Sequence, residues 1–94
     1  MFENPKTPKQ LISALRILAM REPTTREELS TLQSDCTSLL LQLQTSPSLG
    51  HNMPHAVWHF LADADIRFKD PAYAQMQLTG LRAALAKWEH ECAA

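Results

Sequence analysis

The chain has 94 residues, of which 45% are apolar and 20% are charged, and its formal net charge is −1. A chain of this length buries one modest hydrophobic core, so these values predict a single domain over residues 1–94 and exclude two. Neither half carries a strong charge excess, so electrostatics gives no indication of a nucleic-acid or membrane partner.

The composition also bears on the cellular compartment. The first residues lack the basic start and apolar run of a signal peptide, and no stretch approaches the ~20 apolar residues of a membrane span. Cys36 and Cys92 are far apart and outside any Cys-x-x-Cys pattern, so we expect free thiols in a reducing compartment. These features predict a cytoplasmic protein and fit a bacterial cytosol.

The first helix is expected over residues 8–22. Thr7 is a favoured N-cap, and Pro8 follows at the first helical position, where no amide hydrogen is needed. One face carries the apolar residues Leu11, Ile12, Leu15, Leu18 and Ala19. Ile17 and Met20 fall on the opposite face, which a single buried stripe does not explain. We therefore take them as a candidate interface patch.

The second helix is expected over residues 25–44. Thr24 and Thr25 each precede a glutamate by three residues, so a capping box starts the helix in either register. A heptad-like seam follows, made of Leu29, Leu32, Cys36, Leu39 and Leu43. A polar linker with Pro and Gly over residues 45–51 ends the pattern.

Two further helices are expected over residues 53–69 and 71–92. Asp70 and Pro71 separate them, and these residue types are favoured at the N-cap and at the first helical position. The last helix has one apolar seam and a second apolar face containing Gly80. A glycine inside a helix costs up to ~1 kcal/mol relative to alanine, so its presence there indicates close packing against something.

These patterns predict an all-α fold, namely a small four-helix domain made of two helical hairpins. Few β-branched residues and no alternating runs support that class. Up-down packing, orthogonal packing and an arrangement that completes its core as a homodimer all remain open. Residues 1–6 and 93–94 are expected to be flexible.

The leading functional hypothesis is a non-enzymatic protein–protein interaction or self-association module. Its partner would be another protein or a second copy of the chain, because helices with two apolar faces need a second surface to cover. The interface candidates on the last helix are Tyr73, Met76, Gly80 and Ala84. No motif indicates a small-molecule substrate or a cofactor.

Weak metal binding is one alternative. His55, His59 and Asp63 lie four residues apart on one helical face, and this spacing allows two imidazoles and a carboxylate to approach one Zn²⁺ or Ni²⁺ ion. Exposed histidines with no metal explain the same row, so we assign no metal site.

DNA binding is the other alternative. Residues 11–44 resemble the opening of a winged helix-turn-helix domain, with a leucine-rich helix, a Thr-Arg-Glu-Glu-Leu start and a polar break at Gln33-Ser34-Asp35. The resemblance implies that residues 37–44 enter the major groove. That segment has no Lys or Arg, and the leucine seam across the break favours one continuous helix.

Catalytic residues are not indicated by any motif. The chain has no Gly-rich phosphate loop and no nucleophile elbow. Cys36 lies on the expected core seam, where a cysteine acts as a small apolar residue. We therefore expect a non-enzyme.

Overall fold

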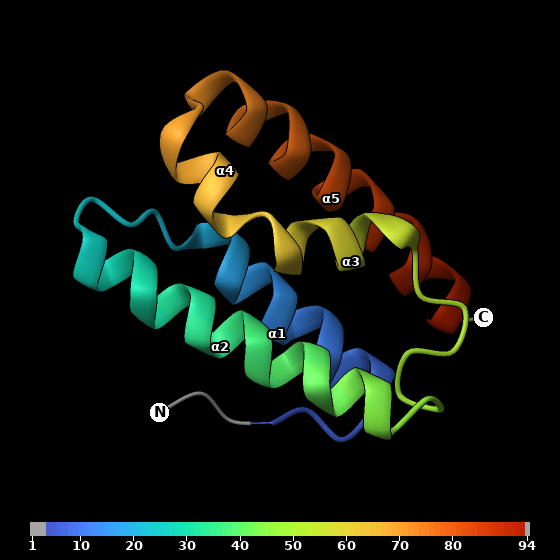
Figure 1. Ribbon diagram of the computed structural model, residues 1–94. Coiled ribbons are helices and arrows are strands. Elements are labelled where there is room, and N and C mark those ends of the chain that lie inside the picture. Colours follow the sequence, from blue (N-terminus) through green and yellow to red (C-terminus); the bar gives the residue numbers. More distant parts are fainter. Residues whose placement is uncertain (1–3, 94) are drawn as a thin grey trace.

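The computed structural model describes residues 4–93, and within them every regular element is an α-helix, which confirms the all-α prediction. The helices are α1 (Pro8–Met20), α2 (Arg26–Thr45), α3 (His55–Ala62), α4 (Ala64–Lys69) and α5 (Pro71–Ala93) (Figure 1). The prediction of one helix over residues 53–69 is wrong, because α3 and α4 share that stretch. The expected flexibility of residues 1–6 and 93–94 falls partly outside the described residues and stays a prediction.

Three helix starts follow the capping chemistry expected from the sequence. The side-chain oxygens of Thr7, Thr25 and Asp70 each accept a hydrogen bond from the amide three residues later, at 3.1 Å in every case. Pro8 and Pro71 are the first residues of α1 and α5. A cap of this kind contributes about 1 kcal/mol, so these starts are encoded locally.

The break between α3 and α4 lies at Asp63, whose backbone has φ −108° and ψ 22°. In a continuous helix the carbonyl of Phe60 would accept the amide of Ala64. Here the Arg67 side chain donates to that carbonyl through Nη1 at 2.6 Å. The Asp63 carboxylate is held by side chains of α5. Contacts across the fold therefore interrupt a stretch whose local pattern is helical throughout.

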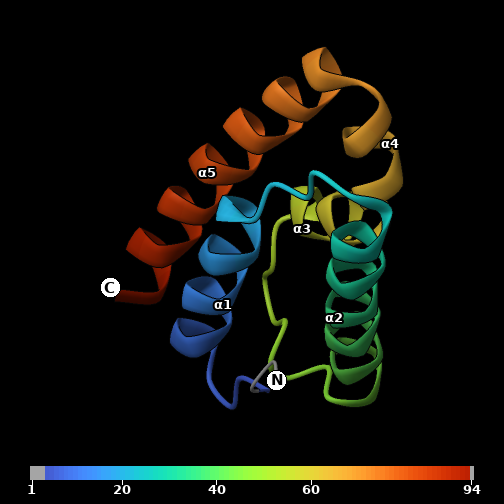
Figure 2. The same cartoon turned by 90° about the vertical axis from the view of Figure 1, so that its left-hand side faces the viewer.

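The first of the two expected hairpins, α1 with α2, does not form a closely packed pair. α1 and α2 run in opposite directions but stand apart, and α5 lies on the side of α1 away from α2 (Figures 1 and 2). α1 packs mainly against α5, whereas α2 packs against α3 and α4. Both α3 and α4 also pack against α5. α5 is thus the helix that joins the two sides of the fold.

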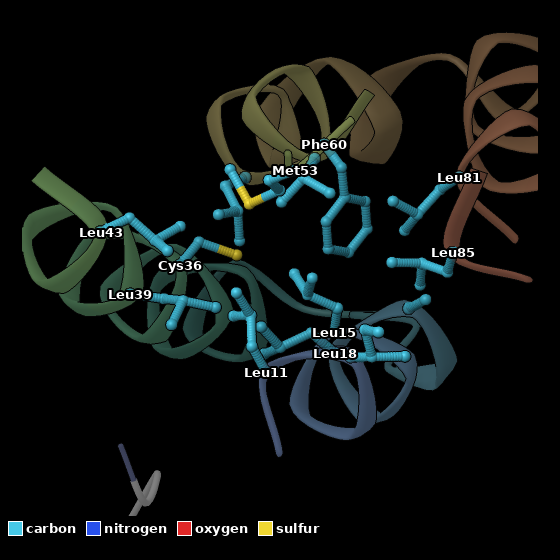
Figure 3. Close-up of a cluster of buried hydrophobic side chains, with 14 of the residues drawn as sticks. Leu11, Leu15, Leu18, Cys36, Leu39, Leu43, Met53, Phe60, Leu81 and Leu85 are labelled. Atoms are coloured by element: carbon cyan, nitrogen blue, oxygen red, sulfur yellow. The ribbon is translucent and has the colours of Figure 1, made fainter. Parts of the chain in front are cut away.

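One hydrophobic core fills the space between these helices. Leu11, Leu15 and Leu18 of α1 meet Cys36, Leu39 and Leu43 of α2, Phe60 of α3, and Leu81 and Leu85 of α5 (Figure 3). All five residues of the expected α2 seam are buried. The linker after α2 contributes as well, because Leu49 and Met53 are buried in the same core.

Candidate functional site

A groove of about 490 Å³ lies at the end of the molecule where α4 joins α5. Figure 2 shows the link between α1 and α2 beneath that joint. The walls come mainly from the end of α1, this link, α4 and the first half of α5, with Leu32 of α2 and Phe60 of α3. We call this hollow the groove, and its lining divides into an apolar and a charged part.

The apolar part of the groove consists of core and core-edge side chains: Leu18, Ala19, Leu32, Phe60, Ala64, Phe68, Ala74 and Leu78. The charged part holds three arginines, Arg21, Arg67 and Arg82, against one acid, Glu22. The whole chain has a net charge of −1. The lining of the groove therefore carries more positive than negative charge, whereas the net charge of the whole protein is negative.

Arg67 forms part of the wall, and its guanidinium is held in three ways. Its carbon lies 4.2 Å from the centroid of the Phe60 ring, a cation–π geometry. Nη1 donates to the Phe60 carbonyl at 2.6 Å and to Gln77 Oε1 at 2.5 Å. Nη2 is buried and has no hydrogen-bond partner among the described residues. Burial lowers the pKa of Arg67 from its ordinary value, because an apolar surrounding disfavours the charged form.

Gln77 connects Arg67 to the nearest carboxylate. Its Nε2 donates to Asp63 Oδ2 at 3.0 Å, and the Tyr73 hydroxyl donates to the same oxygen at 2.8 Å. The hydrogen bond to Asp63 raises the pKa of Tyr73. Asp63 and Arg67 make no direct ion pair within residues 4–92, although their four-residue spacing favours one. The Asp63 carboxylate is therefore linked to the half-buried Arg67 cation by hydrogen bonds through the Gln77 amide and not by a direct ion pair.

The other two arginines differ in their partners. Arg21 is paired with Asp35 of α2 through an Nη1–Oδ2 distance of 2.5 Å, so its charge is largely balanced and its position at the groove edge is fixed. Arg82 is exposed on α5, and the described part of the chain gives it no ion-pair or hydrogen-bond partner. Arg82 is thus the cation best placed to meet a ligand.

The six interface candidates lie outside the groove lining. Ile17, Met20 and Met76 are exposed to 59%, 77% and 63%. A Cβ added at Gly80 would meet nothing within 4 Å, so no described residue packs closely there. Tyr73 and Ala84 are half-buried, and the Tyr73 hydroxyl points to Asp63.

The histidine row is not assembled into a metal centre. His55 and His59 are exposed, whereas the Asp63 carboxylate is engaged by Tyr73 and Gln77. Within residues 4–93 no group of three His, Cys, Asp or Glu side chains could hold a metal ion. The row therefore supplies two separate imidazoles and a structural carboxylate.

The segment that resembles a helix-turn-helix start is continuous in the structure. α2 runs without interruption through Gln33-Ser34-Asp35, and Leu39 and Leu43 of the supposed recognition segment are buried in the core. Cys36 is buried too, and burial raises the pKa of its thiol, whereas Cys92 is exposed. No helix of the described chain has the length and apolar content needed to cross a bilayer.

Comparisons with protein-family models, with curated proteins and with solved structures find no match for this chain. The groove and the exposed helix faces are therefore the candidate functional surfaces. Sequence reasoning missed the groove because its lining comes from separate parts of the chain. One signal was present, since Arg67 interrupts an otherwise apolar stripe between Ala64 and Phe68.

Proposed function

We propose that the protein is a non-enzymatic interaction module, and that the groove binds an amphipathic helix of a partner protein in the cytoplasm. The observation that carries the proposal is the open apolar groove of about 490 Å³ between α1, α4 and α5. Helix-in-groove recognition buries apolar anchors at three- and four-residue spacing in such a hollow. The groove exposes the edges of Phe68, Ala74 and Leu78 for such anchors, all of which are half-buried.

An elongated partner fits this surface better than a compact ligand. A second, shallower hollow of about 330 Å³ adjoins the groove and shares Arg21, Glu22, Pro23 and Leu32 with it. The concave surface therefore continues across the link between α1 and α2. A small ligand is usually enclosed over most of its surface, whereas a helix laid along a trough leaves one side in solvent.

The test uses an uncharged amphipathic peptide of about 18 residues, long enough to form a helix, with leucine at every third or fourth position and glutamine and alanine elsewhere. Amide chemical-shift changes should map to the groove. Ala74→Glu places a charge in the apolar lining and should abolish binding. Ala83→Glu is the matched control, since Ala83 is exposed on the same helix outside the groove. If Ala83→Glu abolishes binding and Ala74→Glu does not, the groove is rejected as the docking site.

Self-association is the second candidate, favoured by the outer face of α5. Met76 is 63% exposed, and the space above Gly80 is open. A second copy could approach closely there, because glycine presents no side chain. Light scattering over a concentration series should then show a dimer, and Gly80→Leu should weaken it. A monomer at every concentration, in both proteins, would exclude this candidate.

A further inference from the structure

We infer that the partner helix is acidic where it crosses the groove, with Asp or Glu beside its apolar anchors. The inference rests on the proposed function and adds the chemistry of the occupant. It follows from the balance of charges in the groove lining, from the different states of its three arginines, and from the change of sign along the trough.

The charge balance leaves two cations without a direct ion pair among the described residues. Arg21 is paired with Asp35. Arg67 has only neutral partners, a carbonyl and an amide oxygen, and Arg82 has none among the described residues. Glu22 is the single acid of the lining. A carboxylate brought into the groove would therefore meet a positive field at an apolar, poorly screened wall, where charge–charge attraction is stronger than in water.

Arg67 and Arg82 would act differently on such a carboxylate. Arg82 is exposed, and its planar guanidinium can donate two parallel hydrogen bonds to a carboxylate on the partner. Arg67 is fixed against Phe60 and Gln77, and its Nη2 is closed off from solvent. Arg67 would therefore attract the partner's carboxylate through the electrostatic field of its fixed, partly desolvated charge, and would not contact it directly.

The sign of the charge changes along the trough. The shallower hollow beyond the groove is lined by Glu22 and Glu28 together with the paired Arg21. Acidic residues of the partner would be repelled there. The acidic segment is thus confined to the part of the helix over Arg67 and Arg82, and this polarity sets the direction in which the helix lies.

The experiment compares three peptides that share one leucine pattern: the glutamine peptide, a version with glutamate beside the anchors of one half, and a version with lysine at those positions. Binding is measured by calorimetry. The glutamate peptide should bind about tenfold more tightly than the glutamine peptide, and the lysine peptide should bind most weakly. The advantage of glutamate should shrink as salt rises from roughly 0.05 M to roughly 0.5 M.

Two variants assign the effect to the groove. Arg82→Gln should lower the ratio of the glutamate peptide's affinity to the glutamine peptide's affinity, both measured on the same variant, by about fivefold. Lys87→Gln is the matched control, because Lys87 is an exposed cation of α5 outside the groove lining. An equal loss in both variants would mean that overall charge, and not the groove, discriminates the peptides.

The possible failures are distinguishable. Equal binding of the glutamate and glutamine peptides overturns the acidic partner and leaves the proposed function standing. No binding of any peptide overturns both. Binding of dodecanoate at the groove without binding of the peptides would identify a small apolar acid as the occupant, and this too overturns the inference.

Discussion

Replacing Gly80 by alanine tests whether the outer face of α5 is open in a monomer or buried against another surface. Gly80 lies inside α5, and a Cβ added there meets nothing within 4 Å. The substitution therefore creates no clash and no contact with residues 4–93. Only the difference in helix propensity remains, about 0.8–1.0 kcal/mol in favour of alanine. For a domain of this size, that stabilisation raises Tm by roughly 4–8 °C.

The assay is urea unfolding followed by far-UV circular dichroism at several protein concentrations. At low concentration Gly80→Ala should unfold at higher urea with an unchanged dependence on denaturant. Ala83→Gly provides the reverse control, since Ala83 is exposed on the same helix, and it should cost a similar amount. If a second copy packs against Gly80, the gain should shrink or reverse as concentration rises.

One result would contradict the expected stabilisation by Gly80→Ala. A loss of stability in Gly80→Ala at low concentration, where dimers are absent, would mean that the added methyl group meets something within the monomer. The open space above Gly80 would then be filled, and the outer face of α5 would no longer be a candidate surface.

Three further outcomes follow from the side-chain contacts. Gln77→Ala removes the amide between Asp63 and Arg67 and should destabilise the fold by about 1–3 kcal/mol in urea unfolding, because it strips a partner from a partly buried donor. An unchanged unfolding midpoint contradicts this. Cys92 should react with a thiol reagent in the native protein, whereas buried Cys36 should react only after unfolding; rapid native labelling of both contradicts it. Arg16 lowers the pKa of Glu89 below its ordinary 4.5. The stabilisation by this ion pair is therefore complete above pH 4.5 and is lost as the pH falls through the lowered pKa of Glu89. Glu89→Gln should flatten the dependence of stability on pH in that acidic range, as measured by acid unfolding.

Local sequence signals were sufficient for the helix starts. The caps at Thr7, Thr25 and Asp70 depend on residues within one turn, so they are readable without knowledge of the fold. The buried seam of α2 was equally readable, because its spacing leaves only one apolar face. These features need no long-range information.

The break at Asp63 was not readable for the opposite reason. Residues 53–69 carry helical periodicity throughout, and Asp63 with Arg67 forms a favourable pair on a continuous helix. The side chains instead bond to α5 and to the Phe60 carbonyl. Those partners belong to the tertiary arrangement, which four-residue spacing does not encode.

The groove was hidden for a related reason. Hairpin reasoning places α1 beside α2, whereas α1 packs against α5 and leaves space where α4 turns into α5. Arg21 and Arg82 are ordinary surface arginines in sequence, and only their approach to Arg67 makes them part of one site. The interface candidates were chosen from exposed helix faces, so they lie outside a hollow formed between helices.

Arg67 is the residue whose presence is least explained by a contribution to the stability of the fold. A half-buried guanidinium without a direct carboxylate partner is costly, and its buried Nη2 forms no hydrogen bond within the described residues. Methionine at this position would keep contact with Phe60 and remove the partly buried charge, but it would also take the donor from the Phe60 carbonyl and from Gln77 Oε1. We therefore expect Arg67→Met to lower the unfolding free energy by about 1–3 kcal/mol, while the preference for the glutamate peptide over the glutamine peptide falls severalfold. A large loss of stability with an unchanged preference would instead make Arg67 a structural residue of the break between α3 and α4.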